Sequence, residues 1–265
     1  MVSVKDSSKP VLAVVGVLVV VVGFVVLANF LTAPKSDTAA QATPSSTETA
    51  SPTETATASA TPSTPEPSPA ALAGCSPVPP PQTDPKRMAS APDPESARGK
   101  TFIATIKTNC GDITVELDGT KAPATVASFN LLAKENYWAP SPCHRLTTDN
   151  DGLWVLQCGD PTGTGSGPGP GYHFGIENAP ADGKYPRGTV AMARSSDPNS
   201  NKDQFFITYK DTQLPTDGGG YTIFGKVTSG MEIIDKIAAA GVSPSDQMTP
   251  LGQLSILSVS VKEKA

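Results

Sequence analysis

Two stretches of the sequence decide the fold: residues 143–160 read CHRLTTDNDGLWVLQCGD, and residues 204–207 read QFFI. They supply one permanent cation, Arg145, and two amide side chains, Gln157 and Gln204. The apolar and aromatic residues that accompany them are Trp154, Val155 and Phe206. This set of side chains suits a site that acts on a bound peptide without making or breaking a covalent bond. It is a poor set for hydrolysis, redox chemistry or phosphoryl transfer.

The motifs of other chemistries are incomplete in this chain. The Gly-Lys-Thr sequence at 99–101 resembles the end of a phosphate-binding loop, but Pro94 stands where that loop needs a glycine. The chain has only two histidines, His144 and His173, and their spacing is not that of metal ligands. The formal net charge of −5 provides no basic surface for nucleic acid. We therefore expect no metal, no other cofactor and no nucleic-acid partner.

The N-terminal part of the chain is predicted to be a membrane anchor. Residues 11–31 form an uncharged run rich in Val and Leu, and about 20 apolar residues suffice to cross a bilayer. Lys5 and Lys9 precede this run, which favours residues 1–10 in the cytoplasm and a single-pass orientation with the remainder outside. The alternative is a secretion signal that is cleaved near residues 38–40. In both cases the C-terminal part leaves the cytoplasm.

Two segments of different composition follow the apolar run. Residues 32–98 consist mainly of Thr, Ser, Ala and Pro, without apolar residues at helix or strand spacing. This composition predicts a disordered or polyproline-like stalk. Residues 99–265 have the length and the apolar content of one globular domain with a core of its own.

The periodicity of the domain predicts a mainly β protein. Residues 101–107 and 112–117 alternate like strands around a turn at Asn109-Cys110-Gly111. Two helices are expected at 123–135 and 231–240. Further short strands are expected at 144–147, 153–158, 188–193, 204–208, 221–227 and 254–261. Many short strands with two separated helices favour a closed antiparallel barrel that is capped by the helices.

The order and spacing of five motifs resemble those of the cyclophilin-type peptidyl-prolyl cis-trans isomerases. These motifs are His144-Arg145, Gln157 before Gly159-Asp160, the run 188–193, Asn199 and Asn201 before 204–207, and the run 224–227. The resemblance covers nearly all of residues 99–265. It implies a closed barrel of eight antiparallel strands with two capping helices and an active face on its outer wall. The anchor and stalk resemble those of extracytoplasmic members from thick-walled bacteria, actinobacteria among them.

The resemblance also implies roles for single residues. Arg145 becomes the catalytic cation, with His144 beside it in the groove, and Gln157 and Gln204 orient the substrate backbone. The proline pocket and its edges would be formed by Trp154, Val155, Phe206, Leu214, Ala193, Arg194 and Tyr221. His144 taken alone has two further interpretations, a general base or a packed strand residue.

The chain departs from the family's pattern at several of these positions. Trp154 stands where the family usually has Phe, Val155 in a Met position, Arg194 where Asn is usual, and Tyr221 where His is common. No Trp lies near Leu214, where many members have one. We expect these departures to affect substrate preference, and to weaken the binding of cyclosporin-type ligands, more than they affect activity.

The four cysteines are expected to form disulfides, because exported proteins meet an oxidising environment. Cys143 and Cys158 flank the strand pair that contains His144 and Gln157, so they can face each other across the ladder. Pairing Cys75 with Cys110 would tie the end of the stalk to the first hairpin. Four reduced thiols are the alternative.

Three functions remain open at this point. The first is an isomerase that acts on X-Pro bonds of exported proteins, as a monomer whose partners are proline-containing polypeptides. The second is a binding module or chaperone for proline motifs with little turnover. The third is a stalked structural or adhesive wall protein, and the joint presence of Arg145 and Gln157 counts against it.

Overall fold

The structure, a computed structural model, describes residues 72–265. The expected cytoplasmic residues 1–10, the anchor at 11–31 and the stalk as far as residue 71 lie outside the described residues. Within the described part, neither α-helix has the length and apolarity needed to span a bilayer.

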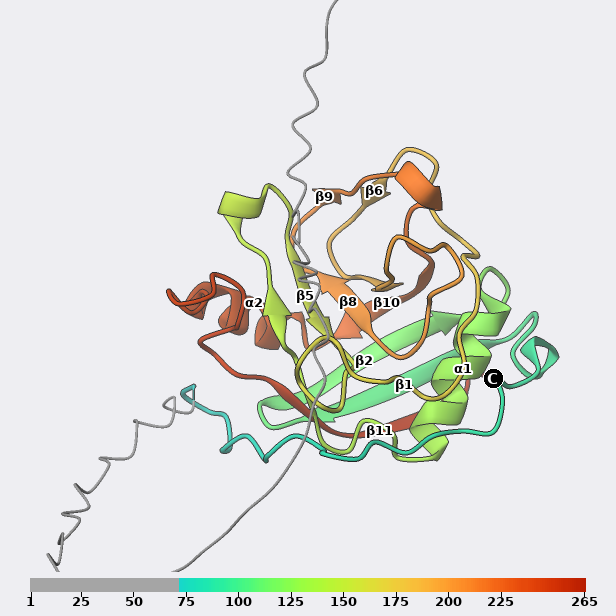
Figure 1. The fold of residues 1–265 in the computed structure, drawn as a ribbon, viewed down its shortest axis with the longest axis horizontal. Helices are drawn as coiled ribbons and strands as arrows, with labels where there is room; N and C mark the ends of the chain where they lie inside the picture. Colours follow the sequence, from blue (N-terminus) through green and yellow to red (C-terminus); the bar gives the residue numbers. More distant parts are fainter. Residues whose placement is uncertain (1–71) are drawn as a thin grey trace, which may run out of the picture. The chain divides into compact units, whose positions relative to one another are not determined.

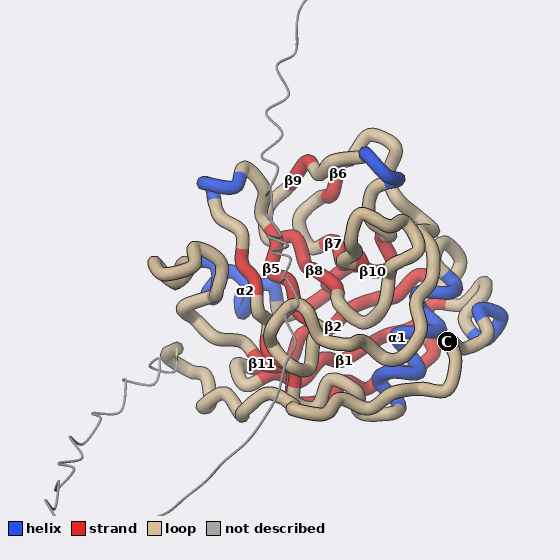
Figure 2. Tube along the Cα trace, viewed as in Figure 1, coloured by secondary structure: helices blue, strands red, loops and turns tan. Residues whose placement is uncertain are grey.

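One antiparallel sheet forms the body of the domain (Figures 1 and 2). Its long strands are β1 (Thr101–Thr108), β2 (Gly111–Asp118), β10 (Ile223–Ser229) and β11 (Ser255–Glu263). Its short strands are β3 (Ser141–Pro142), β4 (Arg145–Leu146), β5 (Val155–Cys158), β7 (Thr189–Met192) and β8 (Phe205–Thr208). The spatial order of the nine strands is β3-β11-β1-β2-β10-β7-β8-β5-β4. Two further strands, β6 (Lys184–Tyr185) and β9 (Thr212–Gln213), pair with each other apart from this sheet.

The predicted class, a mainly β antiparallel fold with two helices, is confirmed, but the closed eight-stranded barrel is not observed in that form. The edge strands β3 and β4 form no ladder with each other within residues 72–265; they are successive parts of one segment, separated by Cys143 and His144. The Cys143 N–H donates to the Leu254 carbonyl at 2.8 Å, and the His144 N–H donates to the Gln157 carbonyl at 3.1 Å. The segment therefore changes partners from β11 to β5. Of the strand expected at 144–147, residues 145–146 form the ladder with β5, and β3 was not expected.

Both expected helices are present and pack one face against the sheet. Helix α1 (Pro123–Lys134) has Pro123 in its first turn, where a missing N–H costs no helical hydrogen bond. Helix α2 (Met231–Ala240) buries Ile233, Ile234 and Ile237. The two helices lie at different ends of the domain in Figure 1.

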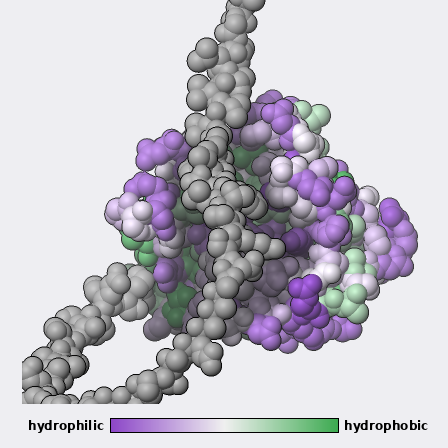
Figure 3. All heavy atoms as spheres, viewed as in Figure 1, coloured by the Kyte–Doolittle hydropathy of each residue, from purple (hydrophilic) through white to green (hydrophobic). Residues whose placement is uncertain are grey.

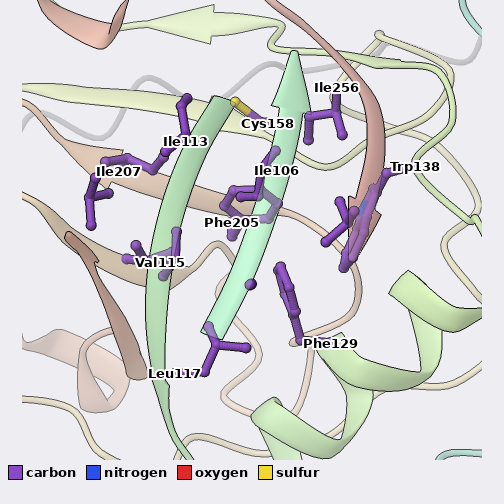
Figure 4. Close-up of a cluster of buried hydrophobic side chains, with 14 of the residues drawn as sticks. Ile106, Ile113, Val115, Leu117, Phe129, Trp138, Cys158, Phe205, Ile207 and Ile256 are labelled. Carbon is purple, nitrogen blue, oxygen red and sulfur yellow. The ribbon is translucent and has the colours of Figure 1, made fainter. Parts of the chain in front are cut away.

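The main hydrophobic core lies between the sheet and the helices. Alternate residues of β1 and β2 point into it, as the period of two requires: Phe102, Ala104 and Ile106, then Ile113, Val115 and Leu117. Figure 4 shows these strands meeting the rings of Phe129, Trp138 and Phe205. The Phe129 and Trp138 ring centroids are 4.7 Å apart. Burying each large side chain contributes roughly 1.5–3 kcal/mol to stability.

Residues 72–98, the N-terminal strap, lie against the domain instead of forming the end of a free stalk. The strap is bonded covalently by Cys75–Cys110. The Gln82 side-chain amide donates to the Tyr137 and Pro140 carbonyls, each at 2.9 Å, and the Met88 N–H donates to Pro170 at 2.7 Å. In Figure 1 the strap runs along β11 towards α1. The domain therefore begins before residue 99, because loop carbonyls satisfy the polar groups of this proline-rich segment.

The surface carries few large apolar side chains. On the face shown in Figure 3, hydrophilic residues cover most of what is visible, and hydrophobic residues form small patches. Among residues 72–265, the exposed large hydrophobic residues are Met248 and Leu251. The domain also has a second buried apolar cluster, which lies outside the main core.

Candidate active site

Register places one row of side chains across five strands. Arg145 on β4 pairs with Gln157 on β5, and Gln157 pairs with Phe206 on β8. Phe206 in turn pairs with Ala191 on β7, which pairs with Ile223 on β10. Directly paired residues of an antiparallel sheet share a face, so these side chains line one side of the sheet. It is the side away from the main core, because Leu156, Phe205 and Ile207 point into that core.

The polar end of this row is a directed chain of hydrogen bonds. Arg145 Nη1 donates to Gln157 Oε1 at 3.5 Å, and Gln157 Nε2 donates to Gln204 Oε1 at 2.9 Å. Gln204 Nε2 then donates to the Gly165 carbonyl at 3.1 Å. Each amide accepts through its oxygen and donates through its nitrogen, so both amide orientations are fixed. Within residues 72–265 the guanidinium makes no other hydrogen bond, which leaves its remaining N–H groups for a ligand.

The apolar end of the row is a second buried cluster, which we call the groove cluster. Its buried members are Val155, Tyr185, Ala191, Phe206 and Leu214, and the partly buried Leu153, Ala193, Tyr221 and Ile223 pack against them. The Phe206 ring meets the Tyr221 ring edge to face, with 5.7 Å between centroids. The cluster thus offers an apolar surface directly beside the Arg145–Gln157–Gln204 chain.

Most residues that the sequence assigned to the site lie together, and Trp154 is the exception. Its indole packs on the main-core side and donates from Nε1 to Asp149 Oδ1 at 2.5 Å. Lys210 Nζ lies 5.1 Å from the indole centroid. Strand β5 begins only at Val155, so Trp154 precedes the ladder, and local polar partners fix its direction. Leu153 packs against the groove cluster instead.

Four members of the groove cluster were not identified from the sequence: Tyr185, Ala191, Leu153 and Ile223. Ala191 and Ile223 follow from the register, because they continue the row that contains Phe206. Tyr185 had no such signal, because it belongs to the two-residue strand β6. Its hydroxyl donates to the Tyr221 carbonyl at 3.0 Å and accepts from the Tyr221 N–H at 2.8 Å.

His144 directly precedes Arg145 and has a lowered pKa. Burial lowers its pKa, and the charge of Arg145 lowers it further, while Asp160 opposes both effects. Its Nδ1 is buried without a hydrogen-bond partner among residues 72–265. The ring packs on Gly165, where φ is +74° and an added Cβ would lie 2.9 Å from the imidazole. Position 165 therefore requires glycine both for its backbone and for its contact with His144.

Asp160 shapes the loop that carries Gly165. Its carboxylate accepts from the Thr162 N–H at 2.9 Å, the Thr164 hydroxyl at 3.1 Å and the Gly167 N–H at 3.1 Å. Burial raises the pKa of Asp160, but these hydrogen bonds outweigh burial and hold the pKa below its usual value. The loop lines a cavity of about 320 Å³ whose other walls include Gln157, Gln204, Ala193 and Arg194.

Asp203 is a buried carboxyl group directly before Gln204. It is 4% exposed and accepts from the Tyr137 hydroxyl at 2.6 Å. Burial raises the pKa of Asp203 to about 6; the Tyr137 hydrogen bond opposes this rise, and the charge of Asp160 adds to it. A buried carboxyl group with a raised pKa therefore directly precedes the Gln204 end of the amide chain.

Both expected disulfides are present in the structure. Cys143–Cys158 joins the residue before His144 to the residue after Gln157, so it ties β4 to β5 behind the site. Cys75–Cys110 fastens the strap to the turn between β1 and β2. In the part of the chain that the structure describes, no group of three His, Cys, Asp or Glu side chains is arranged to hold a metal ion.

Comparison with known proteins identifies relatives of this domain. Residues 103–261 match the family model described as cyclophilin type peptidyl-prolyl cis-trans isomerase. A protein named probable peptidyl-prolyl cis-trans isomerase B from Mycobacterium leprae is 40% identical over 172 residues, which are 60% of this chain and 56% of that protein. The protein of the same name from Mycobacterium tuberculosis H37Rv is 41% identical over 165 residues, 57% of this chain and 52% of the relative.

A solved structure gives the same result. The cyclophilin type peptidyl-prolyl cis-trans isomerase of Cryptosporidium parvum, crystallised in the presence of the dipeptide Ala-Pro, is 32% identical with a TM-score of 0.52. The match covers 61% of this chain and 99% of that structure. The chain spans about half the length of the mycobacterial relatives. Because the family model matches more than half of the sequence, the chain belongs to the cyclophilin-type peptidyl-prolyl cis-trans isomerase family.

Proposed function

We propose that this protein is a peptidyl-prolyl cis-trans isomerase that acts on X-Pro bonds of exported proteins by non-covalent stabilisation of the twisted amide. The observation that carries the proposal is the Arg145–Gln157–Gln204 chain beside the groove cluster. Family membership supports the reaction, and the Ala-Pro dipeptide of the Cryptosporidium structure supports proline-containing substrates.

The reaction places a defined energetic demand on the site. Rotation about an X-Pro bond loses amide resonance at its midpoint, and the barrier is about 18–20 kcal/mol. Uncatalysed exchange takes roughly tens to hundreds of seconds. An acceleration of about 10⁵ requires the barrier to fall by about 7 kcal/mol. Several favourable interactions must therefore be stronger with the twisted amide than with the planar one.

Arg145 is suited to the largest of these interactions. The proline nitrogen regains a lone pair when the amide twists, and a guanidinium N–H can donate to that lone pair. A hydrogen bond from a charged group contributes about 1.5–3 kcal/mol net, and shelter from water strengthens it. The bond to Gln157 orients the guanidinium and leaves its other N–H groups free for this task.

The groove cluster and the two amides are suited to the other interactions that favour the twisted amide. The twisted amide is less polar than the planar one, so an apolar surface around Phe206 and Leu214 favours it. Gln157 and Gln204 each keep one unused N–H and one unused lone pair, with which they can hold the substrate backbone. One half of the substrate can then turn while the other half is held.

We further propose that residues 11–31 anchor the protein in the cell membrane with the domain on the outer side. The uncharged apolar run supports this location. The two disulfides also support it, because disulfides persist in oxidising compartments. External protease should remove the domain from intact spheroplasts; full protection would contradict the orientation, and release into the medium would indicate a cleaved signal.

The activity is tested by measuring cis–trans exchange of a proline-containing peptide with the full chain, by NMR exchange spectroscopy. We expect catalysis by the wild-type protein and a loss of about 100-fold or more in kcat/KM for Arg145→Ala. Arg145→Lys should also be poor, because a point charge does not present the planar donor fork. The matched control is Arg98→Ala, since Arg98 is exposed on the strap and pairs with Glu95.

Two outcomes would contradict the proposal. Absence of turnover in the wild-type protein, together with measurable binding of the peptide, would favour a proline-motif binding module. Wild-type kinetics in Arg145→Ala would retain the reaction but overturn the assigned mechanism.

A further inference from the structure

We propose that Arg194 is a positioning residue that fixes the glycine loop, residues 217–220, and the Tyr221 ring as one wall of the groove cluster. In this role its side chain sets KM for proline peptides by holding the loop and the ring in place. The inference rests on the proposed function and extends it to a residue on the rim of the site.

The glycine loop has little conformational preference of its own. Its sequence is Asp-Gly-Gly-Gly, and φ is +69° at Gly218, +97° at Gly219 and +72° at Gly220. Glycine populates such backbone angles readily, but it also loses more conformational freedom than any other residue when it is fixed. A loop of this kind needs bonds from elsewhere in the fold to hold one conformation.

Arg194 supplies those bonds. Its Nε donates to the Gly220 carbonyl at 2.7 Å, and its Nη2 donates to the Gly218 carbonyl at 3.0 Å and the Asp217 carbonyl at 3.3 Å. Its Nη1 donates to the Ser195 carbonyl at 2.8 Å, which holds the guanidinium against its own segment. Every acceptor is a main-chain carbonyl, so these bonds depend on the backbone conformation of the loop.

The charge of Arg194 is not used in an ion pair. Within residues 72–265, no carboxylate oxygen lies within 4.0 Å of its nitrogens. All three guanidinium nitrogens instead donate to carbonyls in a planar arrangement, and a lysine ammonium cannot reproduce that arrangement. The Arg194 side chain therefore stabilises the backbone of the glycine loop.

The same guanidinium also contacts the ring that closes the pocket. Its Cζ lies 5.1 Å from the Tyr221 ring centroid, a distance suited to a cation–π contact. The Tyr221 ring in turn meets Phe206 edge to face at 5.7 Å, and Phe206 is a buried member of the groove cluster. Contacts thus run from Arg194 through Tyr221 to Phe206.

The test measures kinetics and local backbone opening in the same full-length variants. For Arg194→Lys and Arg194→Ala we expect KM for a proline peptide to rise about fivefold or more, with kcat changed by less than about twofold. Amide hydrogen exchange over residues 215–222 should be faster in both variants, because the Gly219 N–H bond to Thr216 opens when the loop is freed. Arg98→Ala should change neither quantity.

Each result decides the matter. Retention of wild-type KM and exchange in Arg194→Lys would overturn the inference, because a point charge would then suffice. A fall in kcat with KM unchanged would also overturn it, since Arg194 would then act on the twisted amide itself. If the wild-type protein shows no turnover, the proposed function fails. The exchange measurement would then decide separately whether Arg194 holds the loop.

Discussion

The two buried apolar clusters of this domain are held in different ways. The main core lies between the sheet and both helices, and side chains from many elements enclose it. The groove cluster lies on the opposite face of β5, β7 and β8, and two sets of polar contacts border it: the amide chain and the Arg194 bonds. We infer that the core carries the stability of the fold, while the groove carries its recognition of ligands.

The sharpest test of this comparison uses two neighbouring phenylalanines on β8. Phe205 is 1% exposed and points into the main core, and Phe206 is 4% exposed and points into the groove cluster. We expect Phe205→Ala to lower the free energy of unfolding by about 3–5 kcal/mol, since it leaves a cavity in an enclosed core. Phe206→Ala should cost less stability but lower kcat/KM by about tenfold or more.

Chemical denaturation and peptide exchange kinetics on the same two variants provide the measurement. If Phe206→Ala destabilises the protein as much as Phe205→Ala and leaves kcat/KM intact, the division between a structural and a functional cluster is wrong.

A smaller effect is expected at Asp203, which directly precedes Gln204 and accepts a hydrogen bond from Tyr137 of the main core. Its pKa of about 6 in the folded protein lies above the ordinary value of 3.8, so the folded state binds more protons than the unfolded state between these values. Stability from this group is therefore greatest at low pH and falls as pH rises through 6. The titratable groups around it are Tyr137, Asp160 and Lys202.

The variant Asp203→Asn isolates this contribution. Relative to that of the wild-type protein, its free energy of unfolding should increase by about 2 kcal/mol between pH 4.5 and pH 7.5, because the wild type loses this stability and the variant does not. Comparing the difference at two pH values cancels any fixed cost of the new amide. Parallel stability curves for the two proteins over this range would show that Asp203 is not a strained carboxyl.

The smallest effect is expected at His144, which packs on Gly165 but is not part of the amide chain. Because burial lowers its pKa, the side chain should stay neutral above pH 7. The pH profile of kcat/KM should then show no titration by a histidine in that range. His144→Ala should retain kcat/KM within about threefold. A fall of about 100-fold, with loss of a titration in the pH profile, would instead make His144 a general base.

Local patterns predicted the elements that rest on local rules. The alternation of Phe102, Ala104 and Ile106 identified β1, and Pro123 marked the first turn of α1. Arg145, Gln157 and Gln204 were assigned to the site through motif spacing, and the structure brings them into one hydrogen-bonded chain. These features depend on strand period and on motif spacing, and both can be recognised in a sequence.

Features that depend on partners distant in the sequence could not be predicted in this way. Trp154 was placed in the pocket, but its ring packs against the main core and contacts Lys210, which lies far along the chain. The strap was expected to be disordered, because its composition does not show that loop carbonyls near Tyr137 and Pro170 accept its hydrogen bonds. Tyr185 was missed because a two-residue strand has no period to detect.

The bond between Cys75 and Cys110 also determines how the domain responds to mechanical force. Tension applied at Leu72 enters the fold at this disulfide and passes directly to the turn between β1 and β2. Residues 76–109, which include most of the strap and all of β1, lie outside this load path. The bypassed segment has a sequence separation of 35 and would extend to about 120 Å if it were unlocked. A pulled molecule should therefore lengthen by about this additional amount only after reduction, and the strap remains shielded from tension while the disulfide is intact.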